Sequence, residues 1–111
     1  MKPGIYYVIF ESNLGIPGDG LVVVDKGRVY GGDHQFLYRG SYQEREVDIE
    51  AEIFVRHFRG EFKSVFGNIL NFYLILSGKA GDESFQLSGY IAGQSHMKIS
   101  VEGQMQMDLA K

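Results

Sequence analysis

The feature that most constrains this chain is an alternation of apolar and polar residues that recurs almost from one end to the other. A period of two puts every second side chain on the same face of an extended strand, so the alternation indicates half-buried β-strands. In the clearest segment one face carries Val47, Ile49, Ala51, Ile53 and Val55. The alternating segments are 4–12, 20–25, 28–30, 34–43, 47–55, 69–77, 85–91, 97–101 and 105–109.

The connections between these segments are short and rich in turn residues. They include 13–19, 26–27, 78–82, 93–94 and Gly103; residues 18–20 are interpreted as a hairpin turn and residues 31–33 as a bulge or bend. Short connections favour antiparallel neighbours, because a parallel crossover needs about a dozen residues. Eight strands of roughly nine residues, with turns of about four, nearly use up the chain. We expect one all-β domain over residues 1–111, an eight-stranded antiparallel up-and-down barrel, with a two-sheet sandwich as the alternative.

One segment breaks the pattern of alternation. Phenylalanines at positions 54, 58, 62 and 66 lie four residues apart, which is helical spacing, but Gly60 interrupts them and Gly67 follows them. We therefore expect at most one short helix near residues 60–66, whose aromatic face would cover one end of the barrel.

The amino-acid composition indicates the cellular compartment and limits the kinds of molecule that the protein is expected to bind. The sequence has no cysteine, which fits a reducing compartment, and the apolar run after Met1 is too short for a signal peptide. The net charge of −3 argues against general binding to nucleic acids or to anionic membranes. We expect a cytoplasmic protein.

No arrangement of residues in the sequence points to catalysis. His34, His57 and His96 are far apart and lack metal-ligand spacing, and no nucleophile elbow or phosphate-binding loop is found. The basic and aromatic residues 56–59, with Lys63, form a cluster that is small for a nucleic-acid site. The sequence therefore predicts a protein that is not an enzyme, with no catalytic residue, no metal site and no cofactor.

The most informative charged feature is acidic. Glu44, Glu46, Asp48, Glu50 and Glu52 share one parity, so a regular strand would point all five carboxylates to one face. One interpretation is a solvated outer face that is neutralised by arginines of a neighbouring strand. The other is a recognition surface for a basic protein partner, since complementary charge accelerates association.

The first two expected strands are apolar on both faces. In the first, Tyr6, Val8 and Phe10 lie opposite an equally apolar face at positions 5, 7 and 9, and residues 21–24 repeat this pattern. Because an apolar outer wall exposes a patch unless something covers it, we expect a homodimer. We assign Tyr6, Val8 and Phe10 to its interface; the alternative cover is the aromatic segment 58–66.

Several short motifs occur in an order that resembles a known family. They are Gly4-Ile5-Tyr6, residues 9–13, Gly18-x-Gly20, Gly31-Gly32-Asp33, Tyr38-Arg39-Gly40, Arg56-His57, Ser64-Val65-Phe66-Gly67, Phe72-x-Leu74-x-Leu76-x-Gly78 and Phe85-x-Leu87-x-Gly89. In order and spacing they resemble the GrlR family, negative regulators of type III secretion gene expression.

The resemblance implies a lipocalin-like eight-stranded barrel, a homodimer, and a bacterial regulator that binds a transcriptional activator rather than DNA. The family prototype has a surface element Glu-Asp-Glu-Asp, and the matching residues here are Glu44-Arg45-Glu46-Val47. Two of the four acidic positions match, so Glu44 and Glu46 alone are transferred as partner contacts.

A second class of function is a carrier or sensor of a small apolar ligand. A barrel of eight strands can hold one such ligand in its interior. Met97, Met105 and Met107 could pack adaptably around it, because methionine side chains are flexible and polarisable. The alternative is that inward-facing side chains fill the barrel.

Overall fold

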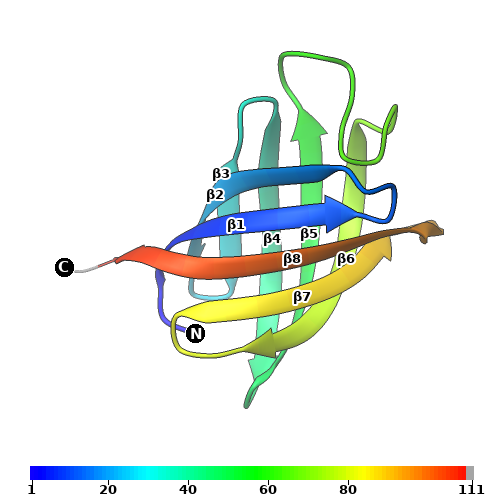
Figure 1. The fold of residues 1–111 in the computed structure, drawn as a ribbon. Helices are drawn as coiled ribbons and strands as arrows, with labels where there is room; N and C mark the ends of the chain where they lie inside the picture. The colour runs from blue at the N-terminus through cyan, green and yellow to red at the C-terminus, as the bar shows by residue number, and fades with distance from the viewer. Residues whose placement is uncertain (110–111) are drawn as a thin grey trace.

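The computed structural model describes residues 1–109, and every regular element in them is a strand. The strands are β1 (Gly4–Ser12), β2 (Pro17–Asp25), β3 (Arg28–Gly32), β4 (Phe36–Arg45), β5 (Asp48–His57), β6 (Asn71–Ala80), β7 (Ser84–Ile91) and β8 (Gln94–Asp108). Each strand pairs antiparallel with the next, and β8 pairs back with β1, so the sheet closes on itself (Figure 1). This closure confirms the predicted eight-stranded antiparallel barrel and excludes the open sandwich.

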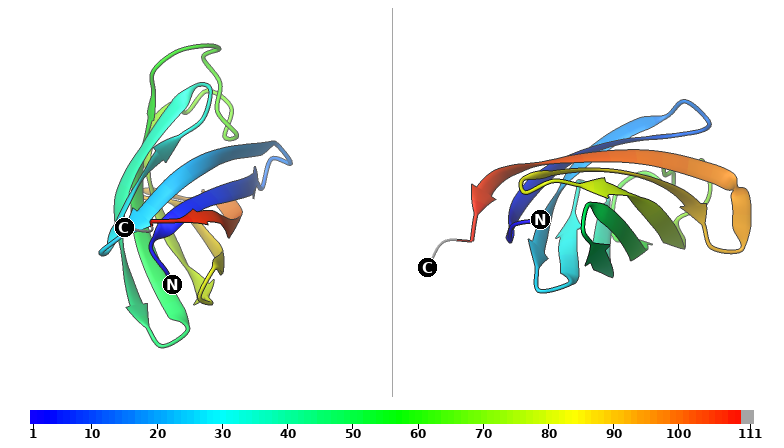
Figure 2. Two further views of the ribbon diagram at one scale, coloured as in Figure 1. Left: turned by 90° about the vertical axis from the view of Figure 1, so that its left-hand side faces the viewer. Right: turned by 90° about the horizontal axis from the view of Figure 1, so that it is seen from below.

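The barrel is flattened rather than round. Its extents are 39 × 26 × 20 Å, and β1, β2, β7 and β8 run across β4, β5 and β6 (Figures 1 and 2). Glycines on the inner face allow neighbouring strands to approach closely. A Cβ at Gly89 would lie 1.8 Å from the carbonyl oxygen of Ile75, and one at Gly78 would lie 1.9 Å from that of Gln86. Only glycine therefore fits these positions of β6 and β7 without a backbone shift.

The segment between β5 and β6 is a long loop. Its residues form turns and one isolated bridge, between Ser64 and Gly67. Gly60 and Gly67 adopt positive φ angles of 85° and 77°, which end any right-handed helical turn, and the Ser64 hydroxyl donates to the Ile69 carbonyl. The short helix allowed near residues 60–66 does not form, and no helix within residues 1–109 is long and apolar enough to cross a membrane.

The last two alternating segments of the sequence form one continuous strand, β8. The prediction of a turn at Gly103 is wrong, because this glycine lies inside β8, opposite Phe85 of β7. A Cβ at position 103 would lie 2.1 Å from the Phe85 ring, so the glycine makes room for an aromatic side chain. The prediction of a hairpin turn at residues 18–20 is also wrong, since they belong to β2.

The exposed fractions of the β1 side chains show which face of this strand points into the barrel. Tyr6 is fully buried and Val8 is 4% exposed, and Phe10 packs against the same core, so all three point into the barrel. Their assignment to an outward-facing dimer interface is wrong, because the alternation of β1 places its odd-numbered residues outside. Tyr7 and Ile9, at 40% and 45% exposure, lie on the outer face instead.

Candidate functional site

One end of the barrel is closed around the N-terminus. The Met1 side chain packs against the core, and its ammonium group lies 2.9 Å from a Glu44 carboxylate oxygen. The Tyr6 hydroxyl donates a hydrogen bond of 2.6 Å to the Lys2 carbonyl. Burial, with a smaller contribution from nearby acidic groups, raises the pKa of Tyr6 to about 12. The polar groups at this end are thus paired with one another.

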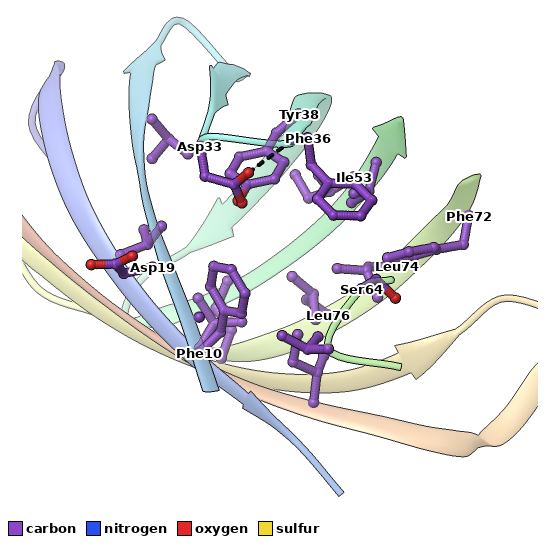
Figure 3. Close-up of a pocket in the computed structure, with 18 of the residues that line it drawn as sticks. Phe10, Asp19, Asp33, Phe36, Tyr38, Ile53, Ser64, Phe72, Leu74 and Leu76 are labelled. Atoms are coloured by element: carbon purple, nitrogen blue, oxygen red, sulfur yellow. Dashed lines mark hydrogen bonds between the residues drawn. The ribbon is translucent and has the colours of Figure 1, made fainter. Parts of the chain in front are cut away.

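The interior of the barrel contains a cavity of about 590 Å³. Its walls are apolar side chains that point inward from β4, β5 and β6, including Phe36, Ile53, Phe72, Leu74 and Leu76 (Figure 3). The loops after β1, β3 and β5 border it at the end opposite the N-terminus, where the exposed residues His34, Glu61 and Lys63 line its rim. The cavity therefore reaches solvent through this ring of loops, and the inward-facing side chains leave a substantial part of the barrel unfilled.

A hydrogen-bonded pair of side chains, Asp33 and Tyr38, lies on the cavity wall near this opening (Figure 3). Oδ1 of Asp33 accepts hydrogen bonds of 2.8 Å from the backbone N–H groups of Gln35 and Phe36, and this holds the bend between β3 and β4. Its Oδ2 accepts from the Tyr38 hydroxyl. Burial, and then the hydrogen bond to Asp33, raises the pKa of Tyr38, so this phenol stays protonated and donates. The interpretation of residues 31–33 as a bulge or bend holds only for Asp33, because Gly31 and Gly32 are regularly paired residues of β3.

Two glycines of β2 provide space for the aromatic rings beside this pair. A Cβ at Gly18 would lie 2.4 Å from the Phe10 ring, and one at Gly20 would lie 3.1 Å from the Tyr38 hydroxyl. The Phe10 and Tyr38 rings meet edge to face, with centroids 6.5 Å apart. The Gly-x-Gly pattern of β2 thus shapes one side of the cavity.

The five acidic residues of the predicted recognition face do not lie on one face. The chain reverses at Glu46, which has a φ of 61°, so Glu44 lies on β4 while Asp48 begins β5. Glu44 is opposite the buried Ile49 and on the inward side of its strand. The single-face prediction is wrong because parity is conserved only along one uninterrupted strand.

The three remaining carboxylates do share the outer face of β5. Asp48, Glu50 and Glu52 are exposed, and Asp48 forms an ion pair with Lys79 of β6. Across the sheet, Glu50 is opposite Gln43 and Ser77, and Glu52 is opposite Ser41 and Ile75. Glu50 and Glu52 therefore have uncharged neighbours directly across the sheet.

The methionines that could have surrounded a ligand lie elsewhere. Met97 and Met105 are partly buried against the core outside the cavity lining, and Met107 is 63% exposed. Met105 fills the space over Gly4, next to an irregularity in the β1–β8 pairing. The aliphatic and aromatic residues of the sheet form the cavity wall instead.

His34, His57 and Arg59 of the basic cluster have structural contacts at the loop between β5 and β6. His57 Nε2 lies 2.9 Å from the Glu61 carbonyl, its ring stacks on Phe62, and Arg59 donates to the His34 carbonyl. Among residues 1–109, no group of three or more His, Cys, Asp and Glu side chains is arranged to hold a metal ion.

Comparisons with known proteins do not assign a relative: no protein-family model matches the chain, and no curated protein matches it. The resemblance to GrlR-type regulators consequently stays a prediction. What the protein does is inferred from its cavity and its surface.

Sequence reasoning missed the Asp33–Tyr38 pair and the cavity beside it. The available signal was a polar residue after two glycines, five positions before an inward-facing tyrosine. The pair can be recognised only once the strand register is known. In that register Gly20 of β2 lies beside Tyr38 of β4, and because glycine has no side chain it leaves space for the tyrosine.

Proposed function

We propose that this protein is a cytoplasmic, non-enzymatic barrel that binds a small apolar molecule in its interior. The observation that supports this proposal is the cavity of about 590 Å³, which is open at one end and lined mainly by aliphatic and aromatic side chains. Sites for small molecules in proteins typically measure about 300–1,000 Å³ and have apolar walls with a few placed polar groups.

The driving force for such binding is the removal of apolar surface from water. Water in this cavity would contact Val55, Phe72, Leu74 and similar side chains, which offer it no hydrogen bonds. An apolar ligand would replace that water and gain roughly 25 cal/mol for each Å² of apolar surface buried. A preformed cavity also limits the entropy lost by the protein on binding.

A probe titration with a cavity-filling variant tests this function. The hydrocarbon fluorophore diphenylhexatriene should bind and become fluorescent. Ala51→Phe places a ring in the cavity, because Ala51 is buried and lines it, and should weaken probe binding at least tenfold. Ser41→Phe, on the exposed face of β4, is the control and should leave binding unchanged. Equal probe affinity in both variants, or no binding to the unmodified protein, would refute the proposal.

A second candidate function is regulation through a basic protein partner. The observation that favours it is the exposed row of Asp48, Glu50 and Glu52 on β5, of which Glu50 and Glu52 have uncharged cross-strand neighbours. The resemblance to GrlR-type regulators supports a transcriptional activator of type III secretion genes as the partner. Of the two transferred contacts, Glu46 is in an exposed turn, whereas Glu44 is engaged by the N-terminus.

The proposed homodimer uses the outer face of the early strands. Tyr7 of β1 is opposite Leu21 of β2, and Val23 lies between Ile5 and Tyr30 in the strand register. Leu21 and Tyr30 are 51% and 52% exposed. This continuous apolar strip is typical of a surface that another protein covers.

A further inference from the structure

The polar groups on the cavity wall differ in how many hydrogen bonds they have left to make. Ser64, which also lines the cavity, donates to the Ile69 carbonyl and accepts from the N–H of Phe66. The Asp33–Tyr38 pair is different, because the Tyr38 hydroxyl and Oδ2 of Asp33 satisfy each other with a single hydrogen bond. Each oxygen of that bond retains lone pairs.

The two side-chain oxygens of this pair can accept further hydrogen bonds but have no proton left to donate. The Tyr38 hydroxyl has given its one proton to Asp33, and an oxygen of this type can still accept. The Asp33 side chain accepts three hydrogen bonds in all and donates none, which is how an ionised carboxyl group behaves. A molecule in the cavity therefore meets, at this point of the wall, oxygens that require a donor.

The other charges around the opening are mixed, so the preference rests on the pair itself. Glu61 and Lys63 are exposed on the rim and carry opposite charges, and Asp19 is exposed on β2, where it accepts a hydrogen bond from the outward-facing Tyr7. The N-terminal ammonium group is at the closed end and is paired with Glu44. A ligand carboxylate placed beside Asp33 would be repelled by a like charge across a short distance, whereas a hydroxyl would not and an ammonium group would be attracted.

We propose that the Asp33–Tyr38 pair selects apolar ligands whose polar end donates a hydrogen bond, such as long-chain alcohols and amines, over fatty acids. This inference rests on the proposed binding of an apolar molecule in the barrel and adds the chemical class of that molecule. The apolar wall accommodates the chain, and the pair at the opening receives the hydroxyl or ammonium group.

Competition between ligands of equal chain length tests the selection. In this assay dodecanol, dodecylamine or dodecanoate is added to compete with bound diphenylhexatriene, each at concentrations below that at which it aggregates. Dodecanol and dodecylamine should displace half of the probe at concentrations at least tenfold lower than dodecanoate, because a carboxylate both lacks a donor and meets a like charge.

Two variants test whether the Asp33–Tyr38 pair causes the preference for dodecanol over dodecanoate. Asp33→Asn keeps an oxygen that can accept from Gln35 and Phe36 but replaces Oδ2 with an N–H donor, so the preference for dodecanol over dodecanoate should fall about tenfold. Tyr38→Phe keeps the ring and removes one acceptor, and should weaken dodecanol binding severalfold without changing dodecanoate binding. Tyr73→Phe, on the exposed face of β6, is the control and should change neither the preference for dodecanol nor the affinity for it.

The outcomes separate this inference from the function on which it rests. If the probe binds but dodecanoate competes as well as dodecanol, or both variants keep the original preference, the inference is overturned while ligand binding stands. If the probe and all three ligands fail to bind, both proposals are overturned. Should Asp33→Asn not fold, the Tyr38→Phe comparison decides the question alone.

Discussion

The substitution Gly89→Ala is predicted to destabilise the barrel strongly although it adds one methyl group. The new Cβ would lie 1.8 Å from the Ile75 carbonyl oxygen and 3.0 Å from the Leu76 Cα, whereas real Cβ atoms essentially never come within 3.0 Å of another heavy atom. Because backbone blocks the space, β6 and β7 would have to separate by more than an ångström.

A separation of that size removes cross-strand hydrogen bonds. Backbone hydrogen bonds have N···O distances of about 2.7–3.2 Å, so a shift of an ångström breaks those around Gly89 and Leu76, which are opposite each other in the register. Each buried backbone group left without a partner costs about 1–3 kcal/mol. Two such groups and the residual strain give a loss of at least about 3 kcal/mol, or about 12 °C or more in Tm.

Thermal unfolding followed by circular dichroism measures this effect. The matched control is Gly81→Ala in the β6–β7 turn, where the nearest atom to the added Cβ is the Ser84 hydroxyl at 3.6 Å. Both substitutions reduce the entropy of the unfolded chain by the same amount, so the difference between them isolates the native-state clash. If the two variants unfold at the same temperature, the close approach of β6 and β7 is refuted.

Three further predictions concern the surface and the closed end. If the proposed dimer forms, Leu21→Asp should give a monomer of about 12.5 kDa in light scattering at micromolar concentration, whereas Tyr73→Asp, on the outer face of β6, should leave the dimer intact; a dimer that survives Leu21→Asp contradicts the proposed interface. The pair Glu50→Lys, Glu52→Lys should weaken binding of a basic partner with little change in Tm, and unchanged binding would eliminate this surface as the contact. Because the pKa of Tyr6 is raised to about 12 in the folded state, the folded protein keeps a proton that the unfolded chain loses near pH 10. The free energy of unfolding should therefore fall between pH 10 and 12, and it should fall less steeply in Tyr6→Phe. If the variant shows the same pH dependence as the unmodified protein, the raised pKa does not belong to Tyr6.

The sequence predicted the strands well because each strand was half-buried and hairpin turns carried their usual residues. The clearest example is Lys26 and Gly27, whose φ angles of 49° and 80° match the expected two-residue turn between β2 and β3. Antiparallel pairing and closure then followed from short connections. The errors arose where one residue type has two structural uses: Gly18, Gly20 and Gly103 make room for aromatic rings and do not form turns.

The side-chain directions of β1 and the cavity itself could not be derived from alternation. Both faces of β1 are apolar, so parity alone does not say whether Tyr6 or Tyr7 is inside; the pairing with β2 and β8 decides it. Likewise, the width of a barrel depends on strand number and stagger, which are properties of the register, so the volume of the inward-facing side chains alone does not give the space left inside. The Glu44–Glu52 prediction failed for a local reason, the reversal at Glu46.

The most direct test of the central claim, that the barrel interior is a ligand site, is a methyl-resolved NMR titration with dodecanol. We predict chemical-shift changes for the methyl groups of Leu74 and Leu76, which line the cavity, and none for Leu21 and Leu37, which are exposed on the outer face. Saturating dodecanol that shifts only the exterior methyl groups, or none, would contradict the account.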